Sequence, residues 1–264
     1  MDTSNLRFGS GQAVRRLEDE QLLIGRGQYA DDVVLSGQTR LAFLRSPHPH
    51  ANIRSIDTSA AEAMPGVHLV LTGAQWRAAG LKNMPPLANF TRPDGKPAAT
   101  APRCPLAFER VRFVGEPVVA IVAETRRQAE DALDHVQVEW EPLAAVTDMK
   151  ASQRGDVVIH PELGDNICFT RSLETEGFEE AFAKAEVVVE KTYDFSRHTG
   201  VTNEPRAILA DYNPAEHALT VYHGTQAPNM MQDVFSRHLN IPESNVRVIC
   251  KDVGGSFGIK VHVY

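Results

Sequence analysis

Two short turn-forming stretches in the last third of this chain constrain its fold more than any other feature. The first runs from Gly224 to Pro228, and the second is the glycine-rich stretch from Asp252 to Lys260. Each follows a run of strand-forming residues, and we expect the first to lead into a helix and the second into an apolar strand. Turns of this kind bring backbone N–H groups close to a large polar ligand. We therefore predict that the rest of the chain is a scaffold that holds the two turns together.

Size, composition and charge exclude several classes of protein. The chain has 264 residues, which is enough for one large domain or two smaller ones. Its net charge of -7 argues against a general nucleic-acid binder, which is normally basic. The sequence contains no run of about 20 apolar residues that would span a membrane, and residues 1–11 lack an apolar signal core. We therefore expect a cytoplasmic protein that has no membrane span and binds no nucleic acid.

The three cysteines, Cys104, Cys168 and Cys250, lie far apart in the chain. They form no C-x-x-C pair, so iron–sulfur or zinc binding by this chain is not expected. Their odd number also argues against a disulfide framework. We expect reduced and mostly buried thiols.

The first half of the chain contains two strand–helix–strand patterns, over residues 51–71 and 117–140. Where the two strands of such a unit share a sheet, the default is a parallel pair with a right-handed crossover. The two helices are expected to start with capping-box spacing, at Ser59 with Glu62 and at Thr125 with Gln128.

The second half is expected to begin after a polar, turn-rich stretch. Its elements are then predicted in order: a helix over 178–185, a strand over 186–195, a hairpin over 206–223, a helix from Pro228 to Leu239 and a strand over 246–250. The helix carries one apolar face that includes Met231, and this face is expected to pack into a core rather than to hold a cofactor.

Neither turn matches a nucleotide-binding motif. The glycines at 254–258 lack the G-x-G-x-x-G spacing, and Lys260 is not followed by Ser or Thr as in a P-loop. Taken alone, the glycines at 254–258 indicate a turn with a purely structural role. Gln226, taken alone, indicates a capping or surface residue. A side-chain amide at Gln226 can also donate a hydrogen bond to an oxo or phosphate oxygen and accept one from a pterin N–H.

An ordered set of segments resembles one family. From about Arg15 to the last residue, the chain is similar to the N-terminal part of the large, molybdopterin-binding subunit of the xanthine dehydrogenase/aldehyde oxidase/carbon monoxide dehydrogenase family. The segments that carry this resemblance are residues 112–125, 140–143, 203–206, 224–228 and 253–258.

The resemblance implies an α+β fold in two parts. After a lead-in over residues 1–19, it implies an α/β hammerhead domain over 20–146. A linker over 147–165 would follow, and then a partial molybdenum-cofactor-binding domain over 166–264.

The same resemblance implies a cofactor and partners. In the family, molybdenum is held by the dithiolene of molybdopterin, here expected in its cytosine dinucleotide form, so no protein side chain is expected to ligate the metal. By motif position, Gln226 would contact the oxo group of the metal, and Gly255, Ser256, Phe257 and Gly258 would contact the cofactor. Electrons would leave to iron–sulfur clusters and FAD on partner subunits.

Departures from the family pattern bear on the substrate. Ser256 and Ile259 stand where the family commonly has glycine. Purine-oxidising members have a glutamate directly after the lysine, whereas Val261 follows Lys260 here, so a purine substrate is disfavoured. An aldehyde, carbon monoxide or an N-heterocycle remains open, with water as the oxygen source.

The length of the chain leaves open whether it is catalytically competent. Family subunits are much longer, and their general-base glutamate lies near the far end, so no catalytic residue is assigned in this chain. Base catalysis needs that carboxylate within about 3 Å of its proton. The alternatives are a truncated, non-catalytic fragment, a subunit completed by another polypeptide, and a scaffold or interaction domain.

Three weaker candidates remain. His48 and His50 have a spacing used by some metal sites, but no third ligand is evident and a solvated turn is expected. Arg197 and His198 would be either substrate-facing or an exposed pair. A third candidate is an internal ion pair that braces the cofactor domain, formed by Glu204 with Arg206.

Overall fold

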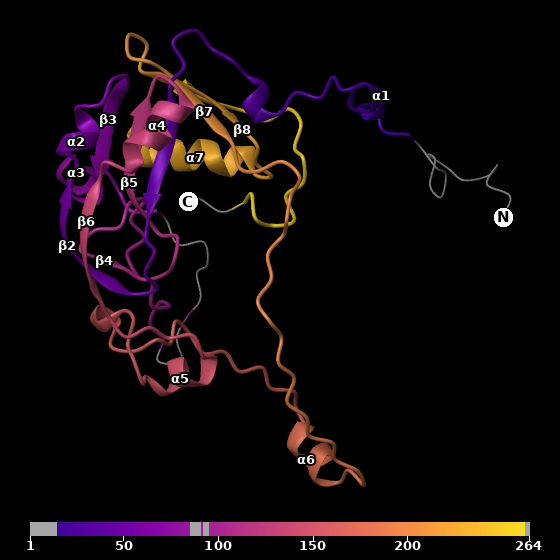
Figure 1. Ribbon diagram of the computed structural model, residues 1–264. Coiled ribbons are helices and arrows are strands. Elements are labelled where there is room, and N and C mark those ends of the chain that lie inside the picture. Colours follow the sequence, from indigo (N-terminus) through magenta and orange to yellow (C-terminus); the bar gives the residue numbers. More distant parts are fainter. Residues whose placement is uncertain (1–14, 85–90, 92–94, 262–264) are drawn as a thin grey trace, which may run out of the picture. The chain divides into compact units, whose positions relative to one another are not determined.

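The computed structural model describes residues 15–84, 91 and 95–261 (Figure 1). The chain divides into two compact units, of which the larger holds Leu35–His198. The smaller combines the described residues up to Val34 with Thr199–Val261. Within the described residues, every helix is too short or too polar to cross a membrane.

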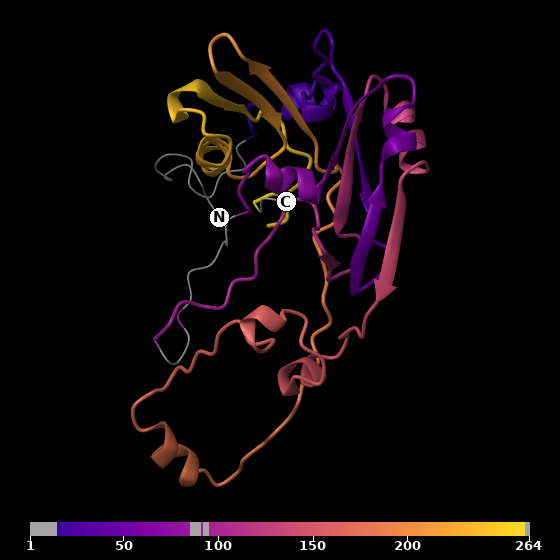
Figure 2. The same ribbon diagram turned by 90° about the vertical axis from the view of Figure 1, so that its left-hand side faces the viewer.

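Two three-stranded antiparallel sheets form the framework of the larger unit (Figure 2). The central strands are β5 (Pro117–Ala123) in one sheet and β2 (Ala51–Asp57) in the other. The outer strands are β1 (Arg40–Arg45) and β3 (Val67–Thr72) beside β5, and β4 (Arg110–Val111) and β6 (Gln137–Pro142) beside β2.

The two predicted strand–helix–strand units exist, but their strands do not pair with each other. Strand β2 lies in one sheet and β3 in the other, and the same holds for β5 and β6. The condition for a parallel crossover is therefore not met, and each of these strands pairs antiparallel with a strand from elsewhere. The connection over residues 58–66 is also shorter than the dozen or so residues that a parallel crossover needs.

Short helices cover these sheets: α2 (Ser59–Glu62), α3 (Gly73–Ala78) and α4 (Arg126–Leu133). The predicted cap of α4 is confirmed, because Thr125 Oγ1 accepts from the Gln128 N–H at 3.2 Å. The predicted capping box of α2 is wrong: Thr58, not Ser59, is the N-cap residue, and its side chain makes no capping hydrogen bond but donates to the Glu62 carboxylate at 2.7 Å. The core joins both sheets with helices α2 and α4, and its buried members include Ala51, Ala61, Val70, Val111, Val118, Val119, Ile121 and Ala132.

Beyond β6, the larger unit is more open. It contains α5 (Met149–Arg154), a 3-10 helix over Pro161–Leu163 and the predicted helix α6 (Phe178–Ala183). The strand predicted over 186–195 is wrong, because these residues have no regular structure and are all exposed. Their alternating pattern is that of a strand, but a strand needs a partner for its backbone, and the described residues supply none.

The smaller unit contains one three-stranded sheet, in the order β7-β8-β9. The predicted hairpin is β7 (Ile208–Asn213) with β8 (Ala218–His223), and β9 (Val246–Ile249) pairs parallel to β8. Helix α7 (Pro228–Leu239) connects β8 to β9 and starts with proline at its first turn, as predicted. Shorter elements are α1 (Asp19–Leu23) and 3-10 helices at Ala30–Asp32 and Glu243–Asn245. The core of this unit is formed by Leu219, Val221, Ile241 and Val246.

Candidate functional site

The first predicted turn lies between the end of β8 and the start of α7. Thr225 is only 2% exposed, and its hydroxyl donates to the Lys260 carbonyl at 2.9 Å. The same hydroxyl accepts from the Ala227 N–H at 3.2 Å, next to the start of α7. The Gln226 N–H also points to the Lys260 carbonyl, at 3.4 Å. The turn is therefore attached to the far end of the second turn by a buried residue.

The second turn holds an exposed aromatic ring on a tightly curved backbone. Gly255 has φ +97° and Gly258 has φ +88°, a region that residues with a Cβ rarely adopt. Phe257 has φ +49° and its side chain is 78% exposed. The residues after it continue as a turn through Lys260, so the strand predicted there is wrong as far as Val261. Residues 262–264, the end of that predicted strand, lie outside the described residues.

The two turns meet at the Gln226 side chain. Its Oε1 accepts from the Gly258 N–H at 3.2 Å and from the Ser256 hydroxyl. Because both partners donate to the side-chain amide of Gln226, the atom that faces them is the oxygen, and the Nε2 group points away from them. No described residue accepts a hydrogen bond from Nε2, which leaves a donor at the junction of the two turns. Four predicted site residues thus lie together: Gln226, Ser256, Phe257 and Gly258.

A buried ion pair lies next to this junction. The Glu204 carboxylate accepts from Lys260 Nζ at 2.6 Å, and the two side chains are 10% and 0% exposed. The same oxygen accepts from the Gly254 N–H at 2.8 Å, and the Glu204 N–H donates to the Gly254 carbonyl at 3.1 Å. A Cβ at Gly254 would lie 2.4 Å from the Cβ of Glu204, so only glycine fits there. The pair therefore connects residue 204 to both ends of the glycine-rich turn.

The predicted ion pair of Glu204 with Arg206 is replaced by this arrangement. The Arg206 guanidinium instead donates to the Ile259 carbonyl at 2.8 Å. Pro205 lies between Glu204 and Arg206 and restricts the backbone there. Glu204 pairs instead with Lys260, which lies 56 residues further along the chain. Sequence reasoning missed Thr225 and Lys260 as parts of the site, because neither carries a local signal for its distant partner.

His223, the last residue of β8, lies beside this ion pair. Its Nδ1 contacts the Ala207 carbonyl at 3.2 Å. Burial lowers the pKa of His223 below its ordinary value, and the Lys260 charge lowers it further, against the raising effects of the Ala207 hydrogen bond and the Glu204 charge.

We expect this histidine to make the chain less stable in mild acid. Because its folded-state pKa is depressed, the unfolded chain binds more protons below about pH 6.5, so the free energy of unfolding falls as the pH drops through that value. His223→Gln should flatten this part of the pH profile, measured by urea unfolding between about pH 7 and 5. His68→Gln, at an exposed position, is the control; an equal flattening there would contradict the assignment.

The weaker candidates form no site. His50 is 4% exposed and its Nδ1 contacts the Ala144 carbonyl at 2.6 Å, so it is a buried residue and not part of a solvated turn. His48 packs edge-on against Trp140, with ring centroids 5.5 Å apart. Among the described residues, no group of three or more potential ligands is placed to hold a metal ion. All three thiols are free, but the expectation that they are mostly buried is wrong, because Cys104 and Cys250 are half-buried and Cys168 is exposed.

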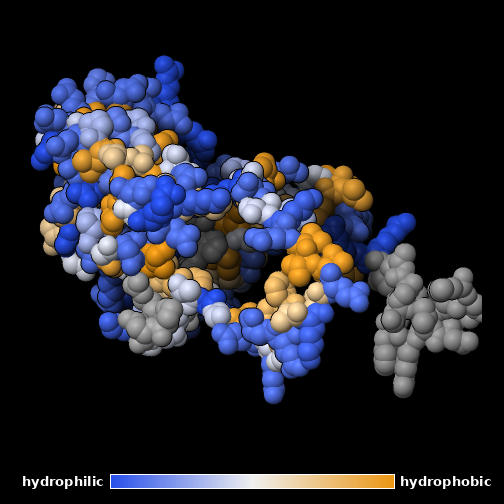
Figure 3. Space-filling model, turned by 90° about the horizontal axis from the view of Figure 1, so that it is seen from below, coloured by the Kyte–Doolittle hydropathy of each residue, from blue (hydrophilic) through white to orange (hydrophobic). Residues whose placement is uncertain are grey.

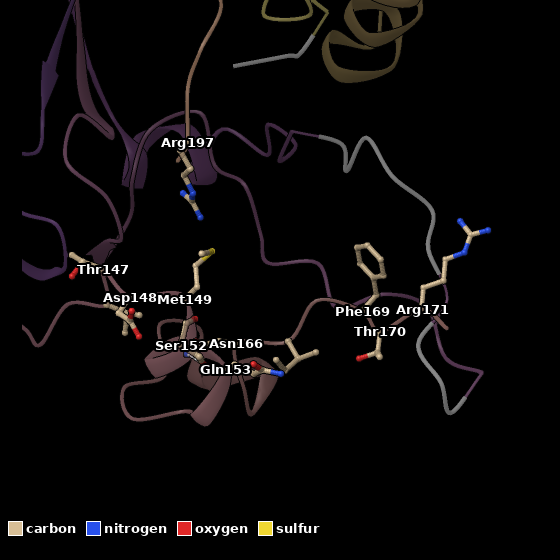
Figure 4. A pocket seen from close by; sticks show the side chains of 12 residues that line it. Thr147, Asp148, Met149, Ser152, Gln153, Asn166, Phe169, Thr170, Arg171 and Arg197 are labelled. Carbon is tan, nitrogen blue, oxygen red and sulfur yellow. Dashed lines mark hydrogen bonds between the residues drawn. The ribbon is translucent and has the colours of Figure 1, made fainter. Parts of the chain in front are cut away.

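A separate concavity occurs in the larger unit. Figure 4 shows Arg197 and Met149 pointing into it from opposite sides, with Thr147, Asp148 and Ser152 along its wall. None of the residues of the two turns lines it. Arg197 therefore lines a pocket, but the arrangement supplies no chemistry of its own.

Comparison with known proteins places this fold and its turns in one family. Residues 24–144 match the aldehyde oxidase and xanthine dehydrogenase a/b hammerhead domain. Residues 159–264 match the molybdopterin cofactor-binding domain. The chain belongs to the xanthine dehydrogenase/aldehyde oxidase/carbon monoxide dehydrogenase large-subunit family, with a hammerhead domain and the start of a molybdopterin-binding domain.

Individual relatives agree with this assignment. The chain is 43% identical over 256 residues to the nicotine 6-hydroxylase large subunit of Paenarthrobacter nicotinovorans, covering 96% of this chain and 30% of that protein. It is 34% identical to the carbon monoxide dehydrogenase large chain of Afipia carboxidovorans, covering 97% and 32%. The crystal structure of quinoline 2-oxidoreductase from Pseudomonas putida 86 matches with a TM-score of 0.85 and 36% identity, covering 94% and 31%. The chain thus spans about a third of the length of these relatives.

Proposed function

We propose that this chain supplies part of the molybdenum-cofactor site of a hydroxylase whose substrate is an N-heterocycle. One observation carries the proposal: Gln226 and the turn at 256–258 converge in a chain that is 43% identical to a nicotine 6-hydroxylase large subunit. The similarity to a quinoline 2-oxidoreductase supports the same substrate class. Val261 directly after Lys260, in place of a glutamate, argues against a purine.

The residues at the junction fit a large polar cofactor. The Gln226 Nε2 group is available to donate to an oxygen of the cofactor. A Cβ at Gly258 would meet nothing within 4 Å, so this side of the turn is open to a ligand. The exposed ring of Phe257 can cover an apolar face of that ligand. We assign cofactor binding to these residues together with Gly255 and Ser256.

Molybdopterin, when bound, would supply the redox centre that takes two electrons from the substrate. In the overall reaction, a C–H bond of the ring is replaced by a C–O bond, the oxygen comes from water, and two electrons and two protons leave. The role of this chain is to orient the cofactor through Gln226 and the glycine-rich turn, which Lys260 and Glu204 hold in place. Preorganised donors of this kind act without rearranging during the reaction.

We propose that the general base and the electron acceptors of the enzyme come from outside this chain. The general base would be a carboxylate in the remaining length of the large subunit, since the chain spans 30% of the nicotine 6-hydroxylase large subunit. Iron–sulfur and FAD subunits would accept the electrons, and the cofactor would have the cytosine dinucleotide form. The relatives' names describe them as subunits, one of them of a complex, which supports a multi-subunit assembly. We propose that this assembly is cytoplasmic.

The proposal is tested by offering the assembled enzyme four substrates in ¹⁸O-labelled water: quinoline, nicotine, an aromatic aldehyde and carbon monoxide. We expect a hydroxylated N-heterocycle that carries ¹⁸O, with a kcat/KM at least about 10-fold above that for the aldehyde. Xanthine is the control for the purine class and should not be turned over. Labelled product from carbon monoxide or the aldehyde alone would reject the N-heterocycle assignment.

A further inference from the structure

One stretch of the larger unit carries apolar side chains that no described residue covers. All residues over 168–198 are exposed. Val189, Tyr193 and Phe195 are 81%, 81% and 80% exposed. Figure 3 shows apolar side chains reaching the surface in clusters among charged ones. A folded protein rarely leaves large apolar side chains so exposed along one continuous stretch unless a partner binds there.

The stretch has the pattern of a strand with one apolar face. Its odd positions over 187–195 are apolar except Lys191, whose aliphatic stem can lie along the same face. Its even positions include the acidic side chains Glu186, Glu190 and Asp194, with Val188 as the one apolar member. Alternation with a period of two is typical of a half-buried strand. The backbone hydrogen bonds and the burial that such a strand needs are both lacking within the described residues.

Helix α6, directly before this stretch, is also uncovered. Phe178 and Phe182 lie one turn apart and stack with ring centroids 5.7 Å apart. Their side chains are 56% and 51% exposed. The two rings extend the apolar surface beyond the strand-like residues, so the surface to be covered includes a helix face as well as an unpaired backbone.

We propose that residues 186–195 are a strand completed by the polypeptide that corresponds to the remaining length of the family's large subunit. Relatives match 96% and 97% of this chain, yet the chain spans only 30% and 32% of them. That remaining length would therefore supply the partner: an apolar segment that adds a strand to 186–195 and buries its odd-numbered face. The acidic even-numbered face stays toward solvent. The inference rests on the family assignment and not on the proposed reaction.

The test measures hydrogen–deuterium exchange and capture with the full chain. The probe is the part of the P. nicotinovorans nicotine 6-hydroxylase large subunit that follows its match to this chain. As a positive control, the part of the P. nicotinovorans subunit that matches this chain must bind the same probe under the same conditions. Adding the probe should slow exchange at residues 186–195 by about 100-fold, because their amides enter a sheet.

Charged substitutions distinguish the two faces of the strand. Val189→Asp and Tyr193→Asp place a charge on the apolar face and should each weaken capture at least about 10-fold. Thr192→Asp places the same charge on the other face and is the matched control, with a change below about twofold. These positions are exposed in the chain alone, so unchanged exchange elsewhere verifies that the variants remain folded.

Three results would overturn the inference. Unchanged exchange at 186–195 in the presence of the probe would show that the remaining length of the large subunit does not pair with this stretch. Protection that arises in the chain alone and grows with its concentration would assign the face to a second copy. An effect of Thr192→Asp equal to that of Val189→Asp would show that the faces are not distinguished. The measurement uses no cofactor, so its failure leaves the proposed molybdenum site standing.

Discussion

Replacing Lys260 with methionine is expected to lower the free energy of unfolding by about 3–5 kcal/mol, because it leaves the Glu204 carboxylate buried without its counter-charge. Glu204 Oε1 already has no hydrogen-bond partner among the described residues, so the lost charge is not compensated locally. Methionine keeps the length and the apolar stem of the side chain. Urea unfolding of the wild-type and variant chains measures the difference.

Two further variants separate the ion pair from general damage. The double variant Glu204→Gln with Lys260→Met removes both charges and is expected to be more stable than Lys260→Met alone. Lys184→Met removes the exposed partner of Glu180, where both side chains are 72% exposed, and should leave the free energy of unfolding nearly unchanged. Equal losses for Lys184→Met and Lys260→Met would contradict the role of burial.

Replacing Gln226 with alanine is expected to lower kcat of the assembled enzyme by about 100- to 1,000-fold, the size of effect found when one preorganised donor is removed. Its cost to stability should be only about 1 kcal/mol, because the lost side-chain contacts are hydrogen bonds to Gly258 and Ser256 at an exposed position. Steady-state kinetics and urea unfolding on the same preparations compare the two effects.

Gln226→Glu is the matched control for this prediction. A carboxylate can still accept from the Gly258 N–H and the Ser256 hydroxyl, but it has lost the Nε2 donor. We expect the stability of the wild type together with the low kcat of Gln226→Ala. If Gln226→Glu is fully active, the donor has no role; if Gln226→Ala loses stability in proportion to kcat, its role is structural.

Elements whose signals are local could be predicted from the sequence. The hairpin β7–β8, helix α7 with Pro228 at its start, and the cap at Thr125 all depend on residues within a few positions of each other. Short-range turn chemistry and helical periodicity are sufficient for such elements. The two turns themselves predict that they lie together, and the family resemblance adds a shared ligand, but the direct hydrogen bonds of Gln226 to the glycine-rich turn are not predicted by either.

Pairings between distant residues could not be predicted in the same way. The short connection between β2 and β3 argues against a parallel crossover, but nothing local indicates which distant strand each of them pairs with. The partner of Glu204 was assigned to Arg206 because the two are near in sequence, whereas tertiary folding brings Lys260 to it. The stretch at 186–195 shows the converse case, because an alternating pattern forms no strand where no partner strand lies among the described residues.

The molybdenum and pterin content of the purified, assembled protein tests the central claim most directly. If Gln226 and the turn at 255–258 hold the cofactor, the wild type should contain molybdenum and pterin at about one of each per chain, and Gly255→Val should lose most of both while α7 and its sheet stay folded. Phe113→Ala, at an exposed aromatic residue outside the two turns, should keep the full molybdenum and pterin content. A folded, assembled preparation with neither molybdenum nor pterin would contradict the account.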